Sequence, residues 1–284
     1  MRAAIVRKFG PPTNISIEND WPIPNINSKQ ILVRVKAASV NPVDTYIRSG
    51  HFGSLPKIPY SPGMDGAGLV EKVGDQVKNF KNGDRVWFLS HNSGACAEFC
   101  SVEEDTVFQL PDGVSFVQGA TLGICYMTAY KALFIDAKAK KGDTVLVHGA
   151  SGGVGLAAIQ IASANGLKVA GTAGTPEGIR IVKENGADHV FNHKENGYVE
   201  KISETFSSGI DVILEMLANV NISHDLDLIT ENGKICIIGS QGAIKLDADK
   251  KKKMQAHCID IYVLISSKKE YQIMGEEKAV GRVA

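Results

Sequence analysis

The chain has 284 residues, and its 44% hydrophobic and 22% charged residues are ordinary values for a folded protein with room for two domains. Its 31 Lys and Arg residues balance its 31 Asp and Glu residues, which excludes a strong overall field for nucleic acid or for an anionic membrane. No apolar run approaches the roughly 18 residues of a membrane span, and charges at Arg2, Arg7 and Lys8 interrupt any signal-like N-terminal stretch.

The first 120 residues predict a β-rich domain with few helices. The stretch ILVRVKAAS alternates apolar and polar residues, as a strand with one face in water does. Turn-forming groups, among them PP, NP, SPG and NGD, separate such stretches from one another. We expect short strands at residues 3–6, 31–37, 68–73 and 85–88.

From residue 121 to residue 265, apolar strands alternate with helical patterns, for example TVLVH before GVGLAAIQIASANG and KVAGT before PEGIRIVKENGA. This alternation predicts βαβ units with right-handed crossovers, and therefore a doubly wound parallel sheet of the Rossmann type. The predicted fold class is α/β, with the β-rich domain beside it. Helix ends are expected at the Asn-Gly pairs 165–166, 185–186 and 232–233.

The stretch VLVHGASGGVGLAAIQIA, residues 145–162, joins one of these strands to the next helix through small residues. Residues 150–155, Ala-Ser-Gly-Gly-Val-Gly, follow the G-x-G-x-x-G fingerprint with alanine in the first place. Gly152 allows backbone N–H groups to approach a pyrophosphate, and Gly155 allows the helix to pack closely on its strand. The pattern predicts a dinucleotide site, with a purely structural turn as the alternative.

The second strand of this series ends at residues 169–176, and the first carboxylate after it is Glu177. An NAD site places Asp or Glu at that strand end, where the carboxylate binds the ribose 2′-hydroxyl. Without this anion a 2′-phosphate is not repelled, so the sequence favours NADP(H) over NAD(H). His193 and Lys194 follow the third strand and either reach the phosphate or are ordinary loop residues.

A series of motifs runs through both halves of the chain: NPVDTYIRSG (41–50), YSPGMDGAGLVEKVG (60–74), FKNGDRVW (80–87), VLVHGASGGVGLAA (145–158), GTAGTPEG (171–178), FNH (191–193), EMLANVN (215–221) and GSQG (239–242). In this order they resemble the quinone oxidoreductases of the zinc-free medium-chain dehydrogenase/reductase superfamily, and most of all their zeta-crystallin branch. The resemblance implies a GroES-like domain at residues 1–120 and a six-stranded Rossmann domain at residues 121–265. It places NADP(H) in a cleft between the two.

The resemblance also assigns site residues. The adenosine phosphate would lie by Gly174 and His193, and the substrate pocket would include Asn41 and Tyr46. Tyr46 would also flank the nicotinamide, unless it is a core aromatic residue, and the 239–242 loop is either a nicotinamide border or a simple strand-end turn. The remaining cofactor contacts would be Ser151, Gly152, Gly153 and Val154 at the pyrophosphate, and Gly239, Ser240, Gln241, Gly242, Tyr262, Val263 and Leu264 at the nicotinamide.

This chain has other residues at the positions where zinc-dependent relatives hold their metal ligands. Those relatives have Cys in place of Asn41 and Gly-His-Glu in place of residues 63–65, Gly-Met-Asp. Methionine is a poor zinc ligand and asparagine supplies no thiolate, so we expect no zinc. Cys125 lies near a further ligand position, but alone it is expected to be a packed thiol. The five cysteines form no Cys-x-x-Cys pair, which favours reduced thiols and a cytoplasmic protein.

Without a metal, alcohol oxidation needs a base, and no such relay stands out; His51 is expected to be a loop or rim residue. A quinone accepts reducing equivalents readily once it is held near the nicotinamide in a water-poor cleft. The sequence therefore predicts an NADPH:quinone reductase, with an orthoquinone as the favoured acceptor and no assigned catalytic residue. The alternatives are an NADPH-dependent enone or enal reductase and a non-enzymatic crystallin-like or AU-rich RNA-binding protein.

Residues 266–284 depart from the family pattern, and IMGEEKAVGRVA at their end resembles no part of it. The resemblance places further helix and strand after this point. We therefore expect an atypical, shortened tail, which weakens the basis for activity and for the homo-oligomer, a tetramer, that the resemblance implies.

Overall fold

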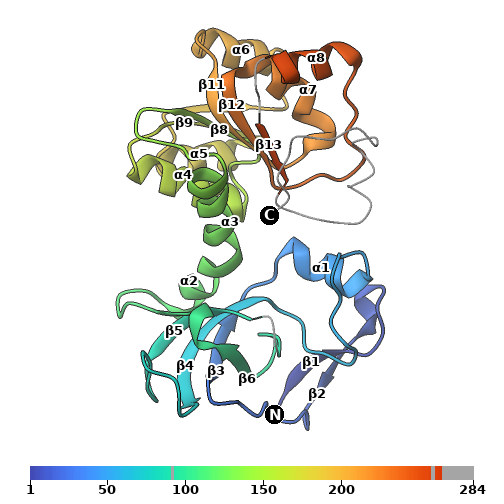
Figure 1. The fold of residues 1–284 in the computed structure, drawn as a ribbon, viewed down its shortest axis with the longest axis vertical. Coiled ribbons are helices and arrows are strands. Elements are labelled where there is room, and N and C mark those ends of the chain that lie inside the picture. Colours follow the sequence, from blue (N-terminus) through green and yellow to red (C-terminus); the bar gives the residue numbers. More distant parts are fainter. Residues whose placement is uncertain (91–92, 257–259, 264–284) are drawn as a thin grey trace. The chain divides into compact units, whose positions relative to one another are not determined.

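A computed structural model describes residues 1–90, 93–256 and 260–263. The chain divides into two compact units, Met1–Ile124 and Cys125–Ala284, which are called the first and the second unit below (Figure 1). Among the described residues, no helix is both long enough and apolar enough to cross a membrane.

Antiparallel strands form the first unit. Strands β1 (Ala3–Val6) and β2 (Ile15–Glu18) pair with each other, and a second sheet has the order β6-β3-β4-β5-β7. Val33 is fully buried and Val35 is half-buried, whereas Arg34 and Lys36 between and after them are exposed, as the period-two pattern predicts. All four predicted strands are present, which confirms the β-rich domain. The strands of the larger sheet are β3 (Gln30–Ala38), β4 (Asp65–Val73), β5 (Arg85–Leu89), β6 (Phe99–Glu103) and β7 (Val107–Gln109).

Short helical segments complete the first unit and lead out of it. Helix α1 (Pro42–Ser49) follows β3, and Asn41 and Asp44 form a capping box at its start. The π-helical stretch η3 (Leu122–Tyr126) carries the chain from the first unit to the second. The others are η1 (Pro12–Asn14), η2 (Glu104–Thr106), α2 (Phe116–Ala120), α3 (Met127–Tyr130) and η4 (Lys131–Asp136).

The second unit is built on a parallel sheet of order β10-β9-β8-β11-β12-β13. Sequential strands run outward from β8 in one direction and from β11 in the other, so the topological switch point lies between these two strands. This confirms the doubly wound Rossmann sheet. The strands are β8 (Thr144–Val147), β9 (Lys168–Ala173), β10 (His189–Asn192), β11 (Ile210–Glu215), β12 (Ile229–Ile237) and β13 (Asp260–Val263).

Helices cover both faces of this sheet (Figure 1). Helices α4 (Gly153–Ala164) and α5 (Pro176–Glu184) pack with η4 in one buried cluster, and α6 (Tyr198–Thr205) and α7 (Ala218–Leu228) pack in another. Helix α8 (Ala248–Ala256) lies against α7. Two apolar faces explain why the central strands read as continuous apolar runs.

One predicted helix end is wrong. Asn165-Gly166 and Asn185-Gly186 follow α4 and α5, and both glycines take positive φ values, 73° and 110°. Asn232-Gly233 instead lies inside β12, because α7 already ends at Leu228. Ile229 pairs with Ile210 of β11, and the register shifts before Lys234 pairs with Val212. Asn232, at φ 62°, accommodates this irregularity, so the pair marks a distorted strand rather than a cap.

Candidate active site

The glycine-rich turn lies at the carboxyl end of β8, next to the switch point. Gly149 has a φ of 57°, and Gly152 is the N-cap of α4. A Cβ on Gly155 would lie 2.6 Å from the Gly149 carbonyl oxygen and 2.7 Å from Ala150 Cα, so only glycine lets the helix sit this close to the turn. Ser151, Gly152 and Gly153 are exposed, and Val154 is half-buried. The N-terminal N–H groups of α4 are therefore available to an anion.

Residues predicted for the adenosine phosphate lie together beyond β9 and β10. A Cβ on Gly174 would lie 2.4 Å from His193 Nε2 and 3.0 Å from Lys194 Cε, so both side chains reach over the end of β9. Thr175 caps α5 by accepting a hydrogen bond from Gly178 N at 3.0 Å. Ser151 Oγ lies 3.1 Å from the Cβ position of Gly178, which brings the glycine-rich turn to the start of α5.

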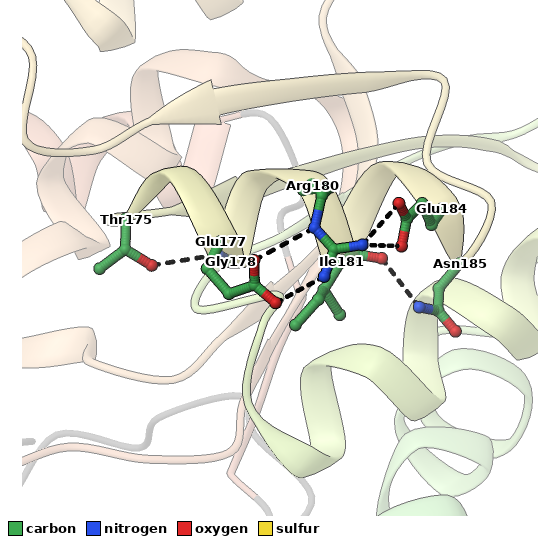
Figure 2. Close-up of polar contacts among 7 residues, drawn as sticks. All are labelled: Thr175, Glu177, Gly178, Arg180, Ile181, Glu184 and Asn185. Atoms are coloured by element: carbon green, nitrogen blue, oxygen red, sulfur yellow. Dashed lines mark hydrogen bonds and ion pairs between the residues drawn. The ribbon is translucent and has the colours of Figure 1, made fainter.

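The charged residues of α5 are engaged with one another (Figure 2). Arg180 binds Glu177 at 2.5 Å and Glu184 at 2.7 Å, and these two carboxylates raise its pKa. Glu177 is the first carboxylate after β9, and its pKa is lowered by the Arg180 guanidinium. Glu177 is thus neutralised along the helix surface, and Arg180 already holds two anions. The basic side chains nearest to Gly174, at the end of β9, are therefore those of His193 and Lys194.

Residues 239–242 lie against the end of the β11–α7 connection and the first turn of α7. A Cβ on Gly239 would lie 2.5 Å from the Met216 carbonyl oxygen, and Gly239 O accepts a hydrogen bond from Ala218 N at 3.0 Å. Asn219 Oδ1 accepts hydrogen bonds from Gln241 N at 2.9 Å and from Ser240 Oγ at 3.1 Å. The sequence motif EMLANVN contained Asn219, but its spacing gave no sign that it would hold the 239–242 loop.

A buried polar cluster beneath the glycine-rich turn was also missed. His148 Nε2 lies 2.9 Å from Asp225 Oδ1 and 3.6 Å from Glu215 Oε2. Glu215 ends β11, Asp225 lies on α7, and His148 directly precedes Gly149. Burial raises the pKa of both carboxyl groups to about 7 and lowers the pKa of His148. Among the described residues, this is the one group of three metal-ligating side chains with mutually close ligand atoms.

In the first unit, Asn41 lies at the centre of a hydrogen-bonded group. Its Nδ2 donates to Asp65 Oδ1 at 2.8 Å and to Ser39 Oγ at 2.9 Å. The other oxygen of Asp65 accepts from Ile124 N at 2.7 Å. Asp65 is fully buried, and burial raises its pKa. The amide of Asn41 is therefore a donor to the neighbouring carboxylate.

The other predicted site residues have fewer contacts that define their role. Tyr46 is half-buried on α1, and His51 is exposed after that helix, with its Nδ1 2.9 Å from Ser49 Oγ. Tyr262 and Val263 belong to β13, where they pair with Cys236 and Ile237. Leu264 and the tail at residues 266–284 lie outside the described residues.

Comparisons with known proteins agree with this layout. The family described as "Alcohol dehydrogenase GroES-like domain" matches residues 27–135, and the family described as "Zinc-binding dehydrogenase" matches residues 153–275. "Quinone oxidoreductase" of Homo sapiens is 48% identical over 273 residues, which are 96% of this chain and 83% of that protein. The Sus scrofa protein of the same name is 49% identical over the same shares.

Solved structures give the same result. The Escherichia coli quinone oxidoreductase complexed with NADPH matches with a TM-score of 0.81 and 31% identity, covering 94% of this chain and 81% of that chain. A mycobacterial protein complexed with NADPH matches with a TM-score of 0.81 and 29% identity, covering 94% of this chain and 82% of that chain.

Proposed function

The chain belongs to the quinone oxidoreductases of the medium-chain dehydrogenase/reductase superfamily, and from this premise we propose that it passes reducing equivalents from NADPH to a quinone. The observation that carries the proposal is the exposed glycine-rich turn at the switch point of the second unit. A nicotinamide cofactor fits there because the close packing of Gly155 places the positive end of α4 at the turn.

We assign NADP(H), rather than NAD(H), to this site. Ser151, Gly152, Gly153 and Val154 would bind the pyrophosphate through N–H groups at the start of α4. Lys194 and His193, which reach over Gly174, would bind the 2′-phosphate. Glu177 would not repel that phosphate, because Arg180 neutralises it. The 239–242 loop, held by Asn219, and residues 262–264 would border the nicotinamide.

When bound, NADPH supplies the reducing equivalents, which a quinone accepts without prior activation. The protein's contribution is then to hold the acceptor and to exclude water. We propose that Tyr46 lines the acceptor pocket and that Asn41 acts there by fixing the start of α1, because its buried amide is already bound to Asp65 and Ser39. Proton uptake by the reduced oxygen needs no dedicated acid, since water can supply the proton.

We further propose that the reaction needs no zinc. A zinc site requires thiolate, imidazole or carboxylate ligands around one point. At the corresponding position Asn41 presents an amide N–H group to Asp65, and Met64 supplies a thioether. These residues do not fit zinc. Treatment with a chelator is expected to leave turnover unchanged, and a stoichiometric loss of both zinc and activity would refute this part of the proposal.

The function is tested by NADPH oxidation with an orthoquinone. We expect turnover by the full chain and its loss in Gly155→Val, because the added side chain would push the turn away from α4. Gly113→Ala is the matched control, since a Cβ at Gly113 meets nothing within 4 Å. Absence of turnover by the unaltered chain would contradict quinone reduction. If the chain instead reduces the carbon–carbon double bond of an enone and does not reduce the quinone, the result would favour the enone reductase.

The domain limits, a cytoplasmic location, a homo-oligomer and AU-rich RNA binding remain predictions. Among the described residues, Cys96, Cys100 and Cys236 form no disulfide.

A further inference from the structure

Three ionisable side chains from separate elements of the second unit meet out of contact with water. His148, Glu215 and Asp225 are 3%, 0% and 0% exposed. His148 Nε2 lies at hydrogen-bond distance, 2.9 Å, from Asp225 Oδ1. Within the described part of the chain, no donor reaches the second oxygen of Asp225 or Oε2 of Glu215. A carboxyl oxygen of Glu215, a carboxyl oxygen of Asp225 and a ring nitrogen of His148 nevertheless all lie within 4.8 Å of one another.

This arrangement requires a proton. Two ionised carboxylates this close together repel each other, and a pair of unbalanced buried anions is strongly disfavoured. The titratable groups that face the cluster from neighbouring elements are Tyr198 of α6 and His193 after β10. Neither is a cation that could balance two carboxylates. Lys131 of η4, which packs on β11, is already paired with Asp136 at 2.8 Å.

The cluster connects the parts of the site that bind the cofactor. Glu215 Oε1 accepts hydrogen bonds from Leu217 N and from Asn221 Nδ2, the latter at 3.1 Å, and so fixes the loop between β11 and α7. Asn219, in the first turn of α7, holds Ser240 and Gln241. On the other side, His148 is the residue before the glycine-rich turn. A change in the cluster therefore reaches both the turn and the 239–242 loop.

We propose that Glu215 and Asp225 share a single proton beneath His148, and that these three positioning residues fix residues 216–221, the β11–α7 connection and the first turn of α7, in the geometry that binds NADPH. This rests on the proposed function for the identity of the ligand. Loss of the shared proton leaves two adjacent anions, which repel each other and move apart. Glu215 then loses its hydrogen bond from Asn221. The added negative charge also lies beneath the turn that binds the anionic cofactor. Affinity for NADPH then falls as the pH rises. Since burial raises the pKa of both carboxyl groups to about 7, the fall lies at and above neutral pH.

Isosteric amides test the proposal, because an amide N–H group replaces the shared proton permanently. In Glu215→Gln, Oε1 still accepts from Leu217 and Asn221 while Nε2 donates to Asp225. In Asp225→Asn, Oδ1 still accepts from His148 while Nδ2 donates to Glu215. Asp227→Asn is the control, because Asp227 lies on the same helix, is exposed and pairs with Lys250.

The dissociation constant of NADPH is measured on the full chain from pH 6 to pH 9, without any quinone. For one linked proton we expect the constant of the unaltered chain and of Asp227→Asn to rise about tenfold or more across this range. In both amide variants it should stay near the value of the unaltered chain at pH 6. An infrared band of a protonated carboxyl group, present at neutral pH in the unaltered chain and absent from both amide variants, supports the proposal even if a variant folds poorly.

Three results would overturn the proposal. These are an unchanged pH profile in Glu215→Gln and Asp225→Asn, the absence of the carboxyl band, or a stoichiometric metal ion that both variants lose. Turnover with quinone plays no part in these readouts. A chain that binds NADPH as expected but reduces no quinone would therefore contradict the proposed function and leave this inference standing.

Discussion

Replacing Gly174 by alanine separates the binding of the 2′-phosphate from the stability of the fold. The added Cβ would lie 2.4 Å from His193 Nε2 and 3.0 Å from Lys194 Cε, and both atoms are near the ends of exposed side chains. Gly174 does not have a left-handed φ, so alanine fits its backbone. The fold accommodates the methyl group by moving these two side chains away from the end of β9.

The magnitude follows from the contacts that are lost. Stability should change by less than about 1 kcal/mol, because alanine also restricts the unfolded chain, by roughly 0.4–1 kcal/mol. A charge-assisted hydrogen bond to a phosphate contributes about 1.5–3 kcal/mol. Since about 1.4 kcal/mol is a factor of ten, the dissociation constant of NADPH should rise roughly 10- to 100-fold. NADH, which lacks the 2′-phosphate, should bind as before.

The assay is a titration of both cofactors against the unaltered chain and Gly174→Ala, with a melting curve for each protein. Lys194→Ala should reproduce the selective loss of NADPH affinity, whereas Lys183→Ala, an exposed lysine on α5, should have no effect. Equal losses for NADH and NADPH, or no loss for either, would refute the assignment of Gly174, His193 and Lys194 to the phosphate.

Three other substitutions have defined outcomes. Arg180→Ala should lower NADPH affinity, because Glu177 then keeps its full negative charge near the 2′-phosphate, and should change denaturant unfolding little, because its ion pairs are exposed; unchanged affinity would show that the charge of Glu177 does not act on the phosphate. Glu215 has a raised pKa, about 7, so its contribution to stability is present at low pH and is lost between about pH 4 and pH 7. Glu215→Gln should flatten this fall and be more stable at pH 8 by on the order of 3 kcal/mol; parallel curves would contradict the raised pKa. Asp65→Ala should destabilise the chain by about 3 kcal/mol or more, because the buried donors of Asn41 and Ile124 lose their acceptor; a shift below about 1 kcal/mol would show that they find other partners.

Periodicity and local glycine chemistry account for what the sequence predicted correctly. The strand and helix patterns around residues 145–162 act over a few neighbours, so the turn, the helix and the parallel sheet could all be predicted. The helix end predicted at Asn232-Gly233 was wrong because pairing of Ile229 with Ile210 makes this segment a strand, against its local preference for a turn. The buried cluster could not be predicted, since His148 and Asp225 are 77 residues apart and meet only through the sheet. Glu215 ends an apolar strand, where its sequence gives no sign of burial.

The hydrogen bonds of Asp65 also constrain which single substitutions this chain tolerates. A drift from Asn41 to cysteine would remove the amide that donates to Asp65, and Met64 would still offer no imidazole. Loss of the Asn41 amide would weaken the capping box of α1 and leave Asp65 with one donor fewer. Position 41 can therefore change without loss only together with the residues around Asp65.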